Sequence, residues 1–427
     1  MSTEPTTEPA GERRDEVEEL RDRVAALELE LADRAARAND ALAMAQDRTY
    51  WLDRWHFDLN AFMRRPLAAR LWRLMPAARA AYRGARKGRE LLEQTRRERT
   101  LAASREESGA LGLGGRSFRR SVAPSELRSA EVTELLLARV DSADLEELER
   151  RLAPEEAALL EGAGDLDRRR FLLSFGVHHE LPGVLDRTGL RPDSPPAEVH
   201  AMGRGPAAAG GSPYYADLVS DALRSVGAPL AAGERALDFG CSSGRVVRVL
   251  AAAYPDVEWH GCDPIPGAVD WARKHLPGIT FERSPEAPPL PYDAGAFDSV
   301  FAISIWSHFA PTAALKWLGE MRRIVKSGGH LVLTAHGHAT LAHDEAGRIR
   351  GTEQLEEIER ALYERGVWFK NEFGPRGDHG VANPDWGTAF LTPEWLLAHA
   401  TPDWEVAEYA PGRVEANQDL YVLRRRR

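Results

Sequence analysis

Cysteine is scarce in this chain of 427 residues, which contains only Cys241 and Cys262. A framework of disulfides is therefore not expected. The chain also lacks an apolar run of about eighteen residues, the length that a membrane-spanning helix needs. It has no pattern of a secretory signal peptide. These absences predict a cytoplasmic protein whose fold does not depend on disulfides.

The chain also has no excess of positive charge. The 66 Asp and Glu residues outnumber the 56 Lys and Arg residues, and the formal net charge is -10. This balance gives no general reason to expect a nucleic-acid partner. Apolar residues make up 43% of the chain, which is enough for a sizeable core, and the length exceeds that of one ordinary domain. At least two domains are expected.

The first part of the chain carries no catalytic motif. Residues 1–11 form a polar tail. Residues 12–48 predict a short coiled-coil helix, because apolar side chains alternate at spacings of three and four: Val17, Leu20, Val24, Leu27 and Leu31. The alternative is one amphipathic helix packed on its own domain. A coiled coil would make the protein a homodimer or would dock it to a partner helix.

An aromatic and basic segment follows at residues 49–100. Within it, residues 64–89 hold eight arginines and one lysine but no acid. Such a helix could lie peripherally on an anionic membrane at its inner face, or it could be a solvated helix packed against the acidic residues 131–161. Residues 101–121 resemble a flexible linker, and residues 122–211 predict short helices that form a cap or docking region.

The first motif that indicates ligand binding is the sequence LDFGCSSGR at residues 237–245. A short apolar run leads into it and helical apolar spacing follows it, so the expected order is strand, loop, helix. Gly240 and Gly244 remove two Cβ atoms where the backbone must bend or approach a ligand. Free amides at the helix start can meet polar ligand atoms. Asp238 adds a carboxylate, which would repel a pyrophosphate but would suit a cationic ammonium or sulfonium group.

A second acid, Asp263, ends the next predicted strand, VEWHGCD, twenty-five positions after Asp238. In doubly wound sheets the end of the second strand lies beside the first glycine loop. A carboxylate there can accept hydrogen bonds from two ribose hydroxyls. Asp263 therefore indicates a nucleoside, and it would suit NAD as well as an adenosyl sulfonium compound.

The segments after the glycine loop resemble the class I S-adenosylmethionine-dependent methyltransferases. They are a third strand at residues 278–284, the phrase PPLPYDAGAFDSVFAIS, and the run HFAPTAALKWLGEMRRIVKSGGHLVLTAHG. The resemblance covers about residues 212–340. It implies an α/β, Rossmann-like domain over residues 212–427, with seven strands of which the last is antiparallel. Two β-rich runs near the C-terminus, at residues 404–412 and 418–425, fit that final hairpin. The implied cofactor is S-adenosylmethionine.

The resemblance also assigns a set of cofactor contacts around the strand ends. We expect the cofactor to meet Tyr215, Asp238, Gly240, Cys241, Gly244, Asp263, Ser284 and Ser304. In the family an acid commonly follows the third strand and holds the adenine amine. This sequence departs from that pattern, and Ser284 or its backbone takes the position.

Two histidines are candidates for catalysis. Methyl transfer mainly requires that the acceptor be aligned with the methyl group. A hydroxyl acceptor must also lose a proton, and histidine is the usual base. His308 and His336 follow the predicted fourth and fifth strands, where ligands bind in open α/β sheets. No metal is expected, because the acids and histidines do not recur at ligand spacing.

The N-terminal phrase LDRW..DLN..MRRP and the coiled coil resemble arms found on bacterial enzymes of surface-polysaccharide assembly. This resemblance implies O-methylation of a sugar hydroxyl on a glycan, or on a related small metabolite. A natural-product or lipid acceptor is the alternative within the enzyme class. A non-catalytic adaptor with the same fold and an NAD-dependent oxidoreductase are alternatives of other classes. The intact Asp238, Gly240, Gly244 and Asp263 argue against the adaptor.

Overall fold

A computed structural model describes residues 124–347, 349–371 and 383–427. Every described residue belongs to one compact unit, Arg116–Arg427. This unit is called the second unit, after its place in the chain. The predicted tail, coiled coil, basic segment and linker at residues 1–121 lie outside the described residues.

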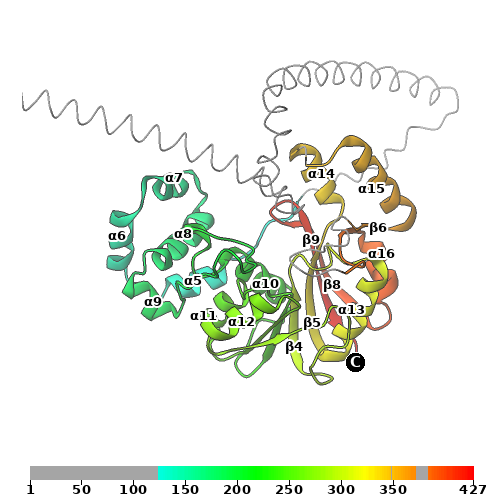
Figure 1. Ribbon diagram of the computed structural model, residues 1–427, viewed down its shortest axis with the longest axis horizontal. Coiled ribbons are helices and arrows are strands. Elements are labelled where there is room, and N and C mark those ends of the chain that lie inside the picture. The colour runs from blue at the N-terminus through cyan, green and yellow to red at the C-terminus, as the bar shows by residue number, and fades with distance from the viewer. Residues whose placement is uncertain (1–123, 348, 372–382) are drawn as a thin grey trace, which may run out of the picture. The chain divides into compact units, whose positions relative to one another are not determined.

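A seven-stranded sheet forms the centre of the second unit, with strands in the order β3-β2-β1-β4-β5-β9-β8 (Figure 1). Five strands run parallel: β1 (Arg235–Phe239), β2 (Glu258–Asp263), β3 (Ile279–Arg283), β4 (Phe297–Ala302) and β5 (Val325–Ala335). The last strand, β9 (Gln418–Arg425), inserts antiparallel between β5 and β8 (Trp404–Val414). The predicted α/β fold class, seven-stranded with an antiparallel last strand, is confirmed.

Side chains along each strand alternate between two apolar clusters, one on each face of the sheet. On β9, Leu420 and Val422 join the first cluster, whereas Tyr421 and Leu423 join the second. Helices α10 (Pro213–Ser225), α11 (Val247–Ala253) and α12 (Pro266–His275) contribute to the first cluster, and α13 (Pro311–Ile324) and α16 (Pro393–Ala400) to the second. Burial on both faces explains why most side chains of the central strands are apolar, with polar exceptions such as Asp238 in β1.

Proline marks where most of these helices begin. It occupies the first helical position of α10, α12, α13 and α16. At that position the backbone N–H has no partner within the helix, so its absence costs little, and the fixed φ of proline suits the helix. The sequence thus specifies these helix starts locally.

Five short helices precede the sheet. They are α5 (Glu131–Leu137), α6 (Ser142–Arg151), α7 (Pro154–Gly162), α8 (Asp165–His178) and α9 (Pro182–Thr188), followed by a 3-10 turn η1 (Pro206–Ala208). Of this group, α5 and α8 pack against α10, which covers the first face of the sheet, and α5 also packs against α11. The fully buried Asp217 of α10 joins them, because it accepts hydrogen bonds from Thr133 Oγ1 at 2.7 Å and from Arg170 Nε at 2.9 Å. Short helices thus occupy residues 131–188. The cap or docking role of residues 122–211 and the domain boundary at residue 212 stay predictions.

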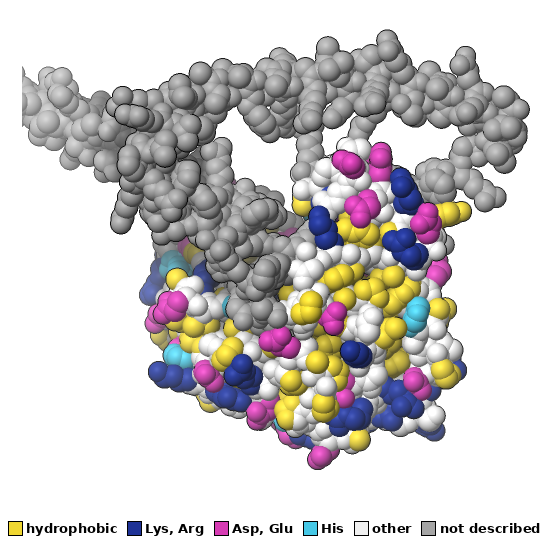
Figure 2. All heavy atoms as spheres, turned by 45° about the vertical axis from the view of Figure 1, so that its right-hand side comes forward, with side chains coloured by type: hydrophobic (Ala, Val, Ile, Leu, Met, Phe, Trp, Pro, Cys, Tyr) yellow, Lys and Arg dark blue, Asp and Glu magenta, His cyan; other side chains and the backbone are white. Residues whose placement is uncertain are grey.

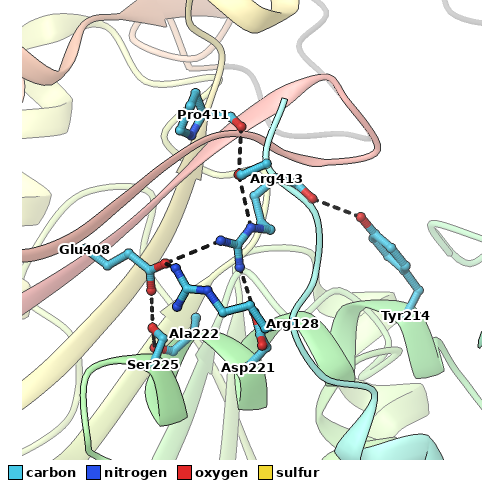
Figure 3. Close-up of polar contacts among 9 residues, drawn as sticks. Arg128, Tyr214, Asp221, Ala222, Ser225, Glu408, Pro411 and Arg413 are labelled. Carbon is cyan, nitrogen blue, oxygen red and sulfur yellow. Dashed lines mark hydrogen bonds and ion pairs between the residues drawn. The ribbon is translucent and has the colours of Figure 1, made fainter. Parts of the chain in front are cut away.

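The start of the described chain is built into the C-terminal hairpin (Figure 3). Ser125 donates hydrogen bonds from its amide and its Oγ to the carbonyl of Pro411, each at 2.8 Å. The buried Arg413 donates to Ser125 Oγ at 3.1 Å and pairs with Asp221 of α10 at 2.6 Å. Tyr214 donates from its hydroxyl to the carbonyl of Arg413 at 3.1 Å. Residues from three distant parts of the sequence therefore meet at one buried ion pair.

A small substructure is inserted between β5 and α16. It consists of α14 (His338–Gly347), α15 (Thr352–Arg365) and the antiparallel pair β6 (Val367–Lys370) and β7 (Thr388–Leu391). Its own apolar cluster includes Ile358 and Phe390. Phe390 forms an isolated bridge with His336, which follows β5. The insertion therefore lies at the carboxyl end of the parallel strands, and the sequence did not predict it.

The surface of the described unit mixes both signs of charge. On the face drawn in Figure 2, basic and acidic side chains are interspersed with apolar ones. Among the described helices, none has the length and apolar character that crossing a membrane requires.

Candidate active site

Two glycines in the loop after β1 occupy positions where any other residue would be strained. Gly240 has φ of 82°, and a Cβ there would lie 2.2 Å from Ile305 Cδ1. Gly244 has φ of 80°, and its Cβ would lie 2.7 Å from Leu276 Cδ1. Positive φ and close packing both require glycine. The loop consequently presents bare backbone at the carboxyl edge of the sheet.

Asp238 lies in β1, two residues before Gly240, and its side chain is buried. The backbone N–H of Val247 donates to its carboxylate, but Oδ2 has no hydrogen-bond partner within the described part of the chain. Burial, the largest cause, raises the pKa of Asp238 to about 8, and the negative charge of Asp263 adds to the effect. An unpartnered buried carboxylate is costly. A cationic ligand beside Oδ2 would remove that cost.

Asp263 ends β2 and is held by two backbone amides. Ser242 N donates to Oδ2 at 2.7 Å, and Ile265 N donates to Oδ1 at 2.9 Å. Burial raises the pKa of Asp263 to about 6, and the two amides oppose this rise. Each carboxylate oxygen can accept more than one hydrogen bond. The two oxygens are therefore fixed in place and still able to accept ribose hydroxyls.

The remaining predicted cofactor residues surround these acids. Ser284 is buried, and its amide donates to the backbone carbonyl of Asp263 at 3.1 Å, so it adjoins the proposed ribose position. Cys241 is buried in the loop, and burial raises the pKa of its thiol well above the usual value. It therefore fits a packing role better than a nucleophilic one. The guanidinium carbon of Arg245 lies over the ring of Tyr215 in α10, 4.8 Å from the ring centroid.

Ser304, after β4, belongs to a polar network with β5 and β9. Its amide donates to Thr334 Oγ1 at 2.7 Å. Gln418, the first residue of β9, donates from Nε2 to Ser304 Oγ at 2.6 Å and accepts from Thr334 Oγ1 at 2.8 Å. Because β9 is antiparallel, its start meets the ends of β4 and β5. Ile305 packs against Gly240, so this network adjoins the glycine loop.

His336 belongs to the same network. Its Nδ1 lies 3.1 Å from the carbonyl of Ala389, so that nitrogen carries the proton, and its Nε2 lies 3.4 Å from Gln418 Nε2. Burial lowers the pKa of His336 to about 3, and the nearby His308 and Arg350 lower it further. The ring is therefore neutral at physiological pH, with both nitrogens facing protein groups.

His308 lies beside His336, and their ring centroids are 6.4 Å apart. Its Nδ1 is 2.7 Å from the carbonyl of Gly387, which fixes the proton on Nδ1 and makes Nε2 the basic nitrogen. The ring stacks on Trp386 at a centroid distance of 4.7 Å. The structure thus brings the two predicted histidines together, next to the segment that packs on the glycine loop.

Sequence reasoning missed three residues of this site: Gln418, Thr334 and Gly387. Gln418 could have been found from the antiparallel last strand, because the first residue of such a strand meets the carboxyl ends of its parallel neighbours. Nothing in the local sequence marks the carbonyl of Gly387. Within the described ranges, no group of three or more His, Cys, Asp or Glu side chains is suited to hold a metal.

Comparisons with known proteins agree with this geometry. Residues 236–329 match a family model described as a methyltransferase domain. The chain is 34% identical over 111 residues to the trans-aconitate 2-methyltransferase of Methylobacterium nodulans, covering 25% of this chain and 39% of that protein. It is 33% identical over 92 residues to the corresponding protein of Methylobacterium radiotolerans, covering 22% of this chain and 31% of that protein. The match thus spans two fifths or less of each relative.

Among solved structures, a methyltransferase of Methanosarcina mazei aligns with a TM-score of 0.35 and 17% sequence identity, covering 46% of this chain and 94% of that one. The sheet itself separates the two nucleoside-binding folds that the sequence left open. A dinucleotide-binding domain continues with parallel strands in the order 3-2-1-4-5-6, whereas here the strand next to β5 is antiparallel. With the family match and the unpartnered Asp238, these features show that the chain carries a class I S-adenosylmethionine-dependent methyltransferase domain.

Proposed function

We propose that the protein transfers the methyl group of S-adenosylmethionine to an oxygen of a small polar acceptor, with a sugar hydroxyl of a glycan or related metabolite as the preferred class. The observation that carries the proposal is the stacked pair His308 and Trp386. The amide of His308 donates to the carbonyl of Ile305, whose side chain packs against Gly240 of the glycine loop. An aromatic face suits the apolar face of a sugar ring, and a histidine suits removal of a hydroxyl proton.

The residues around β1 and β2 fit the cofactor. Asp238 Oδ2 is buried and unpartnered, as a site for an ammonium or sulfonium group requires. The oxygens of Asp263 are oriented by two amides toward hydroxyl partners. Ser284 would adjoin the adenine, and Gly240 allows the backbone to approach closely. When bound, S-adenosylmethionine supplies an activated methyl group on a sulfonium centre.

His308 supplies the base in this proposal. The acceptor oxygen forms a bond to the methyl carbon while the carbon–sulfur bond breaks, and its electron pair stays on sulfur. The hydroxyl proton passes to Nε2 of His308, because the carbonyl of Gly387 holds the proton on Nδ1. General base catalysis of this kind contributes about 10²- to 10⁴-fold to the rate.

His336 takes a different role from the one expected of a catalytic base. Its pKa of about 3 leaves little tendency to accept a proton at neutral pH, and its Nε2 already faces Gln418. We assign it to positioning. A neutral His336 beside His308 avoids placing a second positive charge next to the ring that must become protonated.

A carboxylate acceptor is the second candidate. The relatives that match this chain are named trans-aconitate 2-methyltransferases, and a carboxylate oxygen is nucleophilic without loss of a proton. Methylation of a carboxylate would therefore depend less on His308 than methylation of a hydroxyl. This difference allows the two acceptor classes to be separated by one substitution.

The test uses the full chain with methyl-labelled S-adenosylmethionine and two acceptor panels, methyl glycosides and small carboxylic acids including trans-aconitate. We expect label in the glycosides, lowered about 10²-fold or more by His308→Gln. The matched control is His399→Gln in α16, where the ring bonds to the carbonyl of Trp395. Label in the acids alone, unchanged by His308→Gln, would establish the second candidate. Binding of S-adenosylhomocysteine without transfer to either panel would contradict both.

A further inference from the structure

A cavity lies away from the proposed active site. It has a volume of about 430 Å³ and lies between α9, α11 and the chain around the starts of β2 and β3. Cofactors of this fold bind at the carboxyl ends of the parallel strands, whereas this cavity includes Gly278 and Ile279, where β3 begins. Its volume falls within the range of small-molecule sites, roughly 300–1,000 Å³.

Positive charge dominates the cavity wall. Arg139, Arg187, Arg191 and Arg248 line it, and Asp186 is the one acid among its lining residues. Arg187 is neutralised outside the cavity by Asp141 at 2.5 Å. No carboxylate within the described ranges forms a salt bridge with the other three guanidinium groups.

Arg248 is the most informative of these residues, because it is a buried cation whose side chain contacts only dipoles. It is 8% exposed and donates to the backbone carbonyls of Arg191 and of Asp193, the latter at 3.0 Å. The carboxylate of Asp193 instead contacts His275 Nδ1 at 3.0 Å. Burial lowers the pKa of Arg248 to about 10. The charge of Asp193 partly opposes this shift. Buried charges are normally paired with an opposite charge, and no carboxylate in the part of the chain that the structure describes forms a salt bridge with Arg248, so this wall suits an added anion.

Arg139, another residue of the cavity wall, strengthens the same argument. Its Nη1 and Nη2 donate to the carbonyls of Ala252 and Ala253 at 2.8 and 2.9 Å, at the end of α11. These bonds hold the planar guanidinium rigidly at the cavity. Arginine recognises carboxylate and phosphate well because its donors form a fixed, planar fork.

Apolar side chains form the rest of the wall, among them Val257, Trp259, Leu276 and Ile279. We propose that this cavity is a binding site for a small organic anion, with a carboxylate or phosphate group held by the arginines and an apolar or aromatic body against Trp259 and Ile279. The proposal does not depend on the methyl-transfer reaction.

The experiment is calorimetric titration of the full chain, with saturating S-adenosylhomocysteine to occupy the cofactor site. The probes are phenyl phosphate and benzoate, compared with inorganic phosphate and with the neutral benzyl alcohol. We expect phenyl phosphate or benzoate to bind once per chain, at least tenfold more tightly than inorganic phosphate or benzyl alcohol.

Two variants and one control locate the site. Arg191→Glu reverses a charge on an exposed lining residue, and Ala251→Leu fills the cavity from α11. Each should weaken binding at least tenfold. Arg365→Glu makes the same charge change at an exposed arginine of α15 and should leave binding unchanged. Absence of binding by both aromatic anions, equal binding of benzyl alcohol, or equal weakening by Arg191→Glu and Arg365→Glu would overturn the proposal.

Discussion

The two halves of the proposed active site are built by different means. The cofactor half uses buried acids, Asp238 and Asp263, on consecutive parallel strands, and it is suited to a cation and to hydroxyl groups. The acceptor half uses two histidines and an amide, His308, His336 and Gln418, supplied by a loop, a strand end and the antiparallel β9. The comparison teaches that cofactor recognition is local in sequence, whereas acceptor recognition depends on contacts between distant segments.

The largest expected effect on ligand binding comes from Gly240→Val, which changes the glycine loop of the cofactor half. The new side chain would overlap Ile305 and adopt an unfavourable φ of 82°. We expect binding of S-adenosylhomocysteine to fall below detection by calorimetry while circular dichroism still shows a folded chain. Gly319→Val is the control, because a Cβ at Gly319 would meet nothing within 4 Å. Equal binding by Gly240→Val and wild type would refute the assigned loop.

The next effect in size concerns the acceptor half. Gln418→Leu removes the bonds to Ser304 Oγ and Thr334 Oγ1. Loss of partners for buried polar groups costs about 1–3 kcal/mol in the free energy of unfolding, so we expect a lower midpoint in denaturant. Binding of S-adenosylhomocysteine should change much less than in the Gly240 variant. An unaltered midpoint would show that the network contributes nothing to stability.

The dependence of S-adenosylmethionine affinity on pH tests the role of the acid Asp238 in the cofactor half. Because the pKa of Asp238 is raised to about 8, the site without cofactor favours the protonated acid, and a cation favours the ionised one. Affinity for S-adenosylmethionine should therefore rise by up to about tenfold per unit as pH increases from 6.5 toward 8. Calorimetry on Asp238→Asn should show a flatter profile. An identical slope in wild type and variant would exclude Asp238 as the titrating group.

The same raised pKa predicts how stability without cofactor depends on pH. An acid whose folded-state pKa exceeds its unfolded value stabilises the fold when protonated. The contribution of Asp238 to the free energy of unfolding should thus decline as pH rises from about 4 to about 8. Saturating S-adenosylmethionine should oppose this decline.

The smallest expected effect is that of Trp386→Ala. Trp386 stacks on His308, and such an aromatic pair contributes about 0.5–1.5 kcal/mol. We expect KM for a methyl glycoside to rise up to about tenfold, with unchanged affinity for S-adenosylhomocysteine. Steady-state kinetics at fixed cofactor would measure this. A parallel loss of cofactor affinity would show that Trp386 belongs to both halves.

The signals by which the sequence predicts the cofactor half are local, and its contacts with the cofactor stay predictions. Gly240 and Gly244 mark the loop, and Asp263 follows at the spacing of the next strand end. The sheet and its final hairpin were likewise predicted, from the order of segments. The acceptor half was predicted only in part. His308 and His336 follow strands and were found, but the tautomer of His308 is set by the carbonyl of Gly387, which lies 79 positions away in sequence. No local pattern specifies such a contact.

The inserted substructure at residues 338–391 escaped prediction for a similar reason. Its helices and short strands have ordinary amphipathic patterns, and only pairing of β6 with β7, and of Phe390 with His336, places them over the strand ends. The sequence instead suggested a cap from residues 122–211, whose helices α5 and α8 pack against α10, with α5 also against α11.

The independence of the two halves is tested most directly by titrating S-adenosylhomocysteine into wild type, Asp263→Ala and His308→Ala under identical conditions. Asp263→Ala should weaken binding by at least about 30-fold, the loss of about 2 kcal/mol expected for a buried, hydrogen-bonded charge. His308→Ala should bind as wild type does. Absence of binding by wild type, or equal weakening by both substitutions, would contradict the account.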